Sequence, residues 1–186
     1  MIRKLKTAAI ATVLILFMPQ FAGAQEKLLT FYDLSAKTID GETLNFSVFK
    51  GKKVLVVNTA SECALTPQYK KLQELYEEYG GDDFEIVAFP CNDFAEHEPG
   101  TSEDIKNFCK QFHVSFTLME KVLIRDKEKQ HPVYRWLTNS EENGTLDAKV
   151  LWNFQKFMID TTGHVIDFVG PAGSPFNHRI IEWLQE

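Results

Sequence analysis

Cys63 is the residue of this sequence best placed to do chemistry. It lies between an apolar run, residues 54–57, and Pro67, where a helix is expected to begin. Reactive groups in open twisted sheets lie beyond the carboxyl ends of parallel strands, and the positive end of a helix stabilises a thiolate. The position suits a nucleophile, although a small core cysteine fits the same pattern. Glu62 would disfavour the thiolate if its carboxylate points inward.

Two further cysteines, Cys91 and Cys109, bring the total to three. A small odd number argues against a scaffold built on disulfides. No pair has the Cys-x-x-Cys spacing of a zinc knuckle or of a dithiol oxidoreductase. The histidines show no close ligand spacing with the cysteines; they are His97, His113, His131, His164 and His178. We therefore expect no metal and no cofactor, and the chemistry rests on single thiols.

Hydrophobic spacing predicts the elements around Cys63. Residues 54–57 form a continuous apolar run, typical of a strand that is covered on both faces. Thr66 is the expected N-cap of a helix whose apolar residues recur at helical spacing until Gly80. Residues 84–89 form a second strand of the buried type. Strand, helix and strand in this order predict a right-handed crossover and a parallel pair.

The rest of the chain adds hairpins and helices to this unit. Asp40-Gly41 predicts an edge hairpin over residues 34–44. Thr101 and Asp104 form a capping pattern, which places Cys109 on the helix that follows. The other expected elements are a weak strand at 118–124, a short helix opened by His131-Pro132, a polar loop at 139–147, an antiparallel hairpin from 154–159 and 164–169, and a last helix that starts near Ser174-Pro175 and buries Phe176, Ile180, Ile181 and Leu184.

This order of elements is typical of an α/β protein with a thioredoxin-like fold. We expect a central mixed β-sheet flanked by helices, with an N-terminal β-hairpin. The chain has 186 residues, of which 44% are apolar, and this length fits a single domain with one ordinary core. The formal net charge is -6 and no Lys or Arg cluster follows one face of an element, so nucleic acid is not an expected partner.

Residues 1–24 have the pattern of a secretory signal peptide. Basic residues precede an apolar stretch at 8–18, and Ala22-Gly23-Ala24 supplies small residues for cleavage. The stretch is shorter than the roughly 20 residues that cross a bilayer, so we expect no membrane span. An uncleaved anchor is the alternative. We predict a single domain at 25–186, exported to a periplasmic or other extracytoplasmic space, or by a eukaryotic secretory route.

Three segments resemble the signatures of the glutathione peroxidase family. They run Asn58-Thr59-Ala60-Ser61-Glu62-Cys63-Ala64-Leu65-Thr66-Pro67-Gln68-Tyr69, then Phe89-Pro90-Cys91-Asn92-Asp93-Phe94 with Glu98-Pro99-Gly100, then Trp152-Asn153-Phe154 with Lys156-Phe157. Three signatures in order are far more specific than any single tripeptide. The resemblance implies a thioredoxin-like fold and the reduction of hydroperoxides by a cysteine, here Cys63, which becomes a sulfenic acid.

The resemblance also implies roles for other residues. The indole N–H of Trp152 and the amide of Asn153 are hydrogen-bond donors near the sulfur and the peroxide, where a packed aromatic and a turn-capping amide are the alternatives. His97 stands where the family has Gln. It is expected to donate a hydrogen bond or, when protonated, to stabilise the thiolate; its alternative is to point into solvent.

Cys109 decides how the enzyme is recycled. The segment from Cys109 to Phe116 resembles the one in which thioredoxin-dependent members carry a resolving cysteine, which implies a Cys63 to Cys109 disulfide. A buried core thiol is the alternative for Cys109, and an unreactive core thiol is expected for Cys91. The polar loop between Trp136 and Trp152 is short and lacks the segment that builds tetramers in the family, so we expect a monomer.

The expected partners are hydrogen peroxide or an organic or lipid hydroperoxide, and a thioredoxin-like protein or glutathione as the reductant. Two other functions stay open at this point. One is a thiol-disulfide oxidant that passes its bridge to client proteins. The other is a non-catalytic redox-sensing or binding module, suggested by Glu62, Ala64 and His97, where the chain differs from the family pattern.

Overall fold

The computed structural model describes residues 28–186, so the predicted signal peptide lies outside the described residues. Its centre is a five-stranded sheet in the order β5-β4-β3-β6-β7. The strands are β3 (Lys53–Thr59), β4 (Phe84–Pro90), β5 (Thr117–Leu118), β6 (Lys156–Ile159) and β7 (Val165–Val169). β3 and β4 are parallel, whereas β3 and β6 are antiparallel, so the sheet is mixed as predicted.

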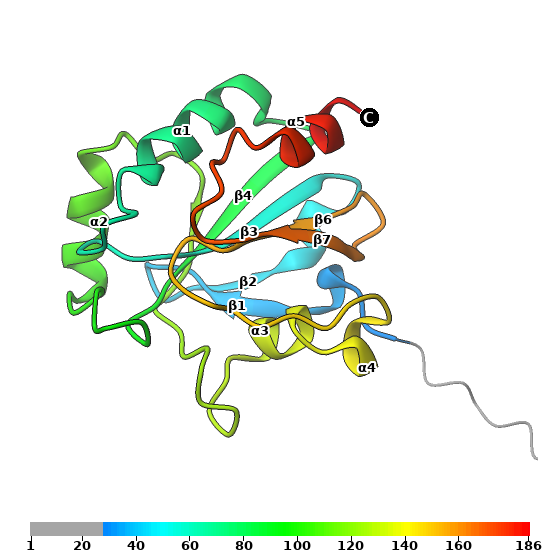
Figure 1. Cartoon of the computed structure of the whole chain (residues 1–186), viewed down its shortest axis with the longest axis horizontal. Helices are drawn as coiled ribbons and strands as arrows, with labels where there is room; N and C mark the ends of the chain where they lie inside the picture. Colours follow the sequence, from blue (N-terminus) through cyan, green and yellow to red (C-terminus); the bar gives the residue numbers. More distant parts are fainter. Residues whose placement is uncertain (1–27) are drawn as a thin grey trace, which may run out of the picture.

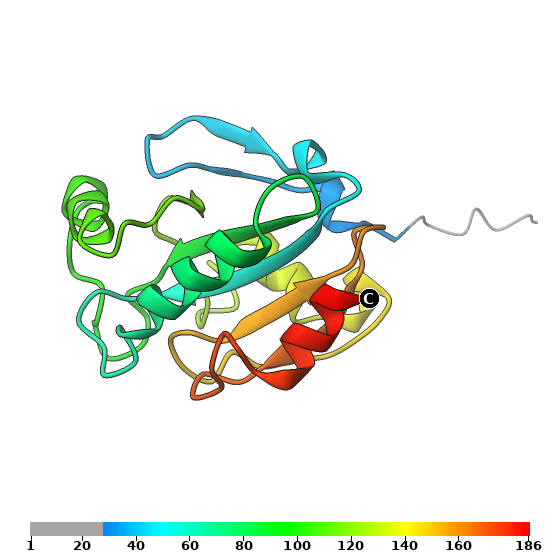
Figure 2. The same ribbon diagram turned by 90° about the horizontal axis from the view of Figure 1, so that it is seen from above.

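Helices cover both faces of this sheet. Figure 1 shows α1 (Gln68–Tyr79) and α5 (His178–Gln185) above the sheet, and α3 (Pro132–Leu137) and α4 (Ser140–Asn143) below it. α2 (Ser102–Lys110) packs its buried residues into the same cluster as α1 and α5. In Figure 2, α1 and α5 lie side by side across one face. No helix among residues 28–186 has the length and apolar character needed to span a bilayer.

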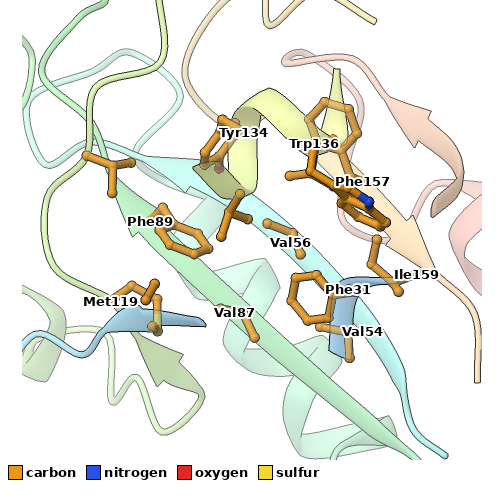
Figure 3. Packing of buried hydrophobic residues seen from close by; sticks show 14 of the residues in the cluster. Phe31, Val54, Val56, Val87, Phe89, Met119, Tyr134, Trp136, Phe157 and Ile159 are labelled. Carbon is orange, nitrogen blue, oxygen red and sulfur yellow. The ribbon is translucent and has the colours of Figure 1, made fainter. Parts of the chain in front are cut away.

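The strand residues alternate between two apolar clusters. Leu55 and Val57 of β3 join the cluster under α1, while Val54 and Val56 face α3. Both faces of the strand are therefore buried, which explains its unbroken apolar sequence. Figure 3 shows the second cluster, where Trp136 of α3 packs over the sheet.

Short N-terminal elements cover the face of the sheet against which α3 packs. The predicted hairpin is confirmed as β1 (Ser35–Lys37) paired antiparallel with β2 (Thr43–Asn45). It is preceded by the 3-10 turn η1 (Phe31–Asp33) and followed by η2 (Phe46–Phe49). The rings of Phe31 and Phe46 stack with centroids 4.5 Å apart, and the indole of Trp136 donates to the carbonyl of Leu29 at 2.9 Å. These contacts tie the N-terminal segment to the core.

Several local predictions are wrong for identifiable reasons. Thr66 does not cap α1 with its side chain, because its hydroxyl accepts from the N–H of Cys63 and donates to Ala60. Asn177, not Ser174, caps the last helix, which leaves Phe176 37% exposed. The loop at 139–147 contains the short helix α4, and the weak strand at 118–124 shrinks to the two residues of β5.

Candidate active site

Cys63 lies in the tight turn that joins β3 to α1. Its side chain is 7% exposed, its N–H donates to Thr66 Oγ1 at 2.9 Å, and the N–H of Leu65 donates to its sulfur at 3.4 Å. A main-chain N–H aimed at sulfur stabilises negative charge there, as the N-terminal end of a helix does. The Glu62 side chain is exposed, so it does not enter the turn.

A second loop docks against this turn. The N–H of Glu62 donates to the carbonyl of His97 at 2.9 Å, and the hydroxyl of Ser61 donates to Glu98 Oε1 at 2.6 Å. Ala95 and Glu96 both have φ of 56°, which bends the chain sharply before His97. This strained turn brings the second signature of the sequence alongside the first.

Trp152 meets His97 at this edge of the sheet. The two rings are 5.7 Å apart between centroids and nearly perpendicular, at 84°, and the indole also packs on Phe94 at 5.9 Å. Trp152 remains 37% exposed, so it borders solvent. His97 is partly buried, and its Nδ1 is buried without a hydrogen-bond partner among the described residues. His97 therefore does not simply point into solvent.

Asn153 is fully buried, yet neither atom of its amide has a hydrogen-bond partner among the described residues. Leaving both unpaired costs free energy, and such groups are rare in native interiors. The carboxamide of Asn153 therefore does not act as a turn cap.

Asn58 fixes this loop from the neighbouring strand. Its side-chain amide donates to the carbonyl of Trp152 at 3.1 Å. Its main-chain carbonyl accepts from the N–H of Phe154, and its side-chain oxygen accepts from the N–H of Gln155. Phe154 itself adopts a φ of 67°. The ring of Phe154 in turn meets Tyr69 edge-on, with centroids 5.5 Å apart. No spacing rule points to Asn58, because its partners lie about a hundred positions away along the chain.

Cys109 lies on α2 as predicted, and it is a buried thiol with 1% exposure. Burial raises its pKa, a hydrogen bond with Tyr69 opposes the shift and the charge of Glu98 adds to it, so that the pKa is about 11. All three cysteines are free thiols in this structure. In the resting fold Cys109 is thus protonated and enclosed, and the resolving role expected from the sequence would require α2 to loosen.

Cys91 has a structural environment. It directly follows β4, its N–H donates to the carbonyl of Thr59, and burial raises its pKa to about 12. Both features fit the unreactive core thiol that was expected. Within residues 28–186, no three His, Cys, Asp or Glu side chains gather in a way that could hold a metal ion.

The fold and the site define a thiol-dependent oxidoreductase of the thioredoxin-like class. A thiol:disulfide interchange protein from Chlorobium tepidum has the same fold, with a TM-score of 0.60 at 18% identity over 87% of this chain and 99% of its own. The apo structure of Trgpx superposes with a TM-score of 0.65 at 32% identity, covering 85% of this chain and 97% of that one.

Sequence comparison narrows the class to one family. The model of the family described as glutathione peroxidase matches residues 31–138. A glutathione peroxidase from Lactococcus lactis is 44% identical over 79% of this chain and 93% of its own length. A glutathione peroxidase-like peroxiredoxin 2 from Saccharomyces cerevisiae is 44% identical over 74% of this chain and 85% of its own length. The chain belongs to the glutathione peroxidase family and is a peroxidase.

Proposed function

We propose that Cys63 reduces hydrogen peroxide and organic or lipid hydroperoxides, and that Cys109 then resolves the oxidised enzyme. The observation that carries this proposal is the buried, unpaired amide of Asn153, on the loop that also holds Trp152 against His97. An amide without a partner among the described residues, next in sequence to a partly exposed indole, suits a small oxygen-rich molecule that needs hydrogen bonds as its O–O bond breaks.

The chemistry of the first step follows from these groups. The thiolate of Cys63 attacks one peroxide oxygen, an S–O bond forms and the O–O bond breaks. Cys63 becomes a sulfenic acid, and the departing alkoxide or hydroxide takes up the proton that the thiol released. Trp152 and Asn153 stabilise the charge on the departing oxygen, and His97 adds a third polar group where relatives use Gln.

The second step recycles the enzyme. Cys109 attacks the sulfur of the sulfenic acid, a disulfide forms and water leaves. A thioredoxin-like protein then reduces the disulfide, with glutathione as the other candidate reductant. Relatives named as peroxiredoxins, from Saccharomyces cerevisiae and Schizosaccharomyces pombe, support a protein reductant. A relative named as a hydroperoxy fatty acid reductase, from Synechocystis, supports lipid-derived substrates.

The site of action in this proposal is extracytoplasmic. The basic start, the apolar stretch at 8–18 and the small residues at 22–24 support removal of residues 1–24 during export. The remaining domain, 25–186, would then work as a monomer. N-terminal sequencing of the protein recovered from a periplasmic fraction tests this point, since a chain that still begins at Met1 would contradict it.

Peroxide consumption in the presence of thioredoxin and its reductase tests the two cysteine roles. Cys63→Ser is expected to abolish turnover, and Cys109→Ser is expected to stop it after a single equivalent of peroxide. Cys91→Ser is the matched control, because it removes a buried thiol from the apolar cluster on the other face of the sheet and should retain turnover. If Cys109→Ser turns over with thioredoxin as the wild type does, the resolving role is wrong. Fast oxidation of unfolded dithiol proteins with slow reduction by thioredoxin would instead indicate a thiol-disulfide oxidant.

A further inference from the structure

A shallow groove separates the turn of Cys63 from helix α2. It is lined by Ser61 and Glu62, by Glu98, and by Ile105 and Phe108 of α2. Ser61 lies two positions before Cys63, and Phe108 immediately precedes Cys109 in α2. Near neighbours of both cysteines therefore line the same groove.

Glu98 is the buried acid of this groove. Its side chain has no exposed surface, Oε1 accepts from the Ser61 hydroxyl at 2.6 Å, and Oε2 is buried without a hydrogen-bond partner among the described residues. Its main chain is held from two sides, because its N–H donates to Asn92 Oδ1 at 2.8 Å and its carbonyl accepts from Lys121 Nζ at 2.9 Å. A carboxyl that is fixed in place with one oxygen unpaired is a prepared proton acceptor.

The surroundings of Glu98 include both ends of the resolving reaction. Ser61 is two positions from Cys63, and the negative charge of Glu98 raises the pKa of the Cys109 thiol. Burial raises the pKa of Glu98 itself, so it exchanges protons closer to neutral pH than an exposed carboxyl does. The titratable groups that face it from the neighbouring elements are Glu62, Tyr69, Cys91, Cys109 and Lys121.

We propose that Glu98 takes the proton from Cys109 in the resolving step and returns it to the oxygen that leaves Cys63. This inference rests on the proposed function, because it requires the Cys63 to Cys109 disulfide. The family resemblance implies no role for this glutamate. Its hydrogen bond to Ser61 ties its carboxyl group to the turn that carries Cys63.

In the resolving step, the Glu98 carboxylate accepts the proton of the Cys109 thiol, and the resulting thiolate attacks the sulfur of the Cys63 sulfenic acid. The S–S bond forms as the S–O bond breaks, and the departing hydroxide takes the proton from the Glu98 carboxylic acid to become water. Thiol and sulfenic acid are converted to disulfide and water, and Glu98 ends as the carboxylate with which it began.

A single-turnover experiment on the full chain separates this role from a structural one. One equivalent of hydrogen peroxide is added to the reduced protein, samples are quenched over time, and mass spectrometry measures sulfenic acid and disulfide separately. In Glu98→Gln, which keeps the shape and the hydrogen bond to Ser61, sulfenic acid should form within about threefold of the wild-type rate. Disulfide formation should slow by about 10²-fold or more, the usual effect of losing a general acid-base group.

The pH dependence of disulfide formation separates a proton-transfer role of Glu98 from a role in packing alone. The wild-type rate of disulfide formation should fall as pH drops through the pKa of Glu98, because the protonated acid cannot accept the thiol proton. Glu98→Gln should lack this fall. Glu98→Asp keeps an ionisable group on a shorter arm and should restore part of the rate, and it supplies the test if the Gln variant does not fold.

The outcomes distinguish the two proposals. A wild-type chain that forms sulfenic acid but never the Cys63 to Cys109 disulfide would overturn the resolving role of Cys109, and the role of Glu98 with it. A wild-type chain that forms the disulfide at a rate that Glu98→Gln and Glu98→Asp both match would overturn Glu98 alone. Equal slowing of both steps in the Gln variant would also overturn it, since that is the result of a distorted loop.

Discussion

The ring of Trp152 stands edge-on to the ring of His97, at 5.7 Å between centroids and 84° between planes. The two residues come from signatures more than fifty positions apart, and the hydrogen bond from the N–H of Glu62 to the carbonyl of His97 joins the loop of His97 to the turn of Cys63. A partly exposed indole and a histidine nitrogen without a partner thus form one polar edge. The first predictions concern this edge.

Trp152→Phe should slow the oxidation of Cys63 by peroxide by about 10²-fold, because it removes the indole N–H but keeps a ring against His97 and Phe94. Stopped-flow measurement of thiol loss under excess peroxide gives the rate. Leu151→Ala is the matched control, since Leu151 is 62% exposed and offers no donor. Equal rates for Trp152→Phe and the wild type would show that the indole is only a packing group.

Asn153→Leu should lose activity without losing stability. Both amide atoms are buried without a hydrogen-bond partner in residues 28–186, so an apolar side chain of similar size should remove an unfavourable contribution to the free energy of the folded state. We expect an unchanged or higher midpoint of thermal unfolding and a peroxide rate lower by about 10²-fold or more.

Asn143→Leu is the control for that variant. Asn143 is equally buried, but its amide donates to the carbonyls of Trp136 and Leu146 and its oxygen accepts from Thr145. Its replacement should cost about 3 kcal/mol or more of unfolding free energy and leave the peroxide rate near that of the wild type. Strong destabilisation of Asn153→Leu would contradict the idea that its amide is reserved for a ligand.

Thr101→Ala should speed disulfide formation. Thr101 caps α2 through a reciprocal pair of bonds with Asp104, and losing such a cap costs about 1 kcal/mol, which is about fivefold in the population of opened helix. We expect up to that increase in the rate of Cys63 to Cys109 bridging. Asn177→Ala removes the cap of α5 instead and should leave the rate unchanged. A slower rate in Thr101→Ala would argue that an intact α2 delivers Cys109.

The buried Lys156 is expected to make the free energy of unfolding depend on pH. It is fully buried, its ammonium donates to Gln68, Pro171 and Gly173, and burial lowers its pKa from 10.5 to about 7. Between these values the unfolded chain binds more protons than the folded one, so this residue makes stability rise with pH from about 7 upward.

Urea unfolding at pH 7 and pH 9 measures the effect against Lys156→Met, which keeps a side chain of similar length. As pH rises, the difference in unfolding free energy between the wild type and Lys156→Met should shift in favour of the wild type by up to about 1.4 kcal/mol per pH unit. A difference that stays constant across this range would mean that Lys156 keeps its proton in the folded state.

The fold could be predicted from the sequence where local pattern and burial agree. The run at 54–57, the helix after Pro67 and the cap at Thr101 all give periodic or capping signals, and each element is present. Thr66 was misread because the same hydroxyl that would cap a helix is used to close the turn of Cys63. Short elements such as β5 depend on neighbouring strands and carry little signal of their own.

The candidate site was predicted unevenly for a related reason. Cys63, Trp152 and His97 belong to recognisable segments, and the structure brings their loops together. Asn58 and Glu98 act through partners far away in the sequence, to which no spacing rule points. Their importance lies in contacts between loops, and those become visible only once the sheet has aligned the strand ends.

The most direct test of the account is peptide mapping of the reduced protein after one equivalent of hydrogen peroxide, quenched early with a thiol-blocking reagent. We expect a rapid Cys63 to Cys109 disulfide, with Cys91 still carrying the blocking group. Three blocked thiols and unconsumed peroxide would contradict the central claim that Cys63 is the peroxide-reducing residue.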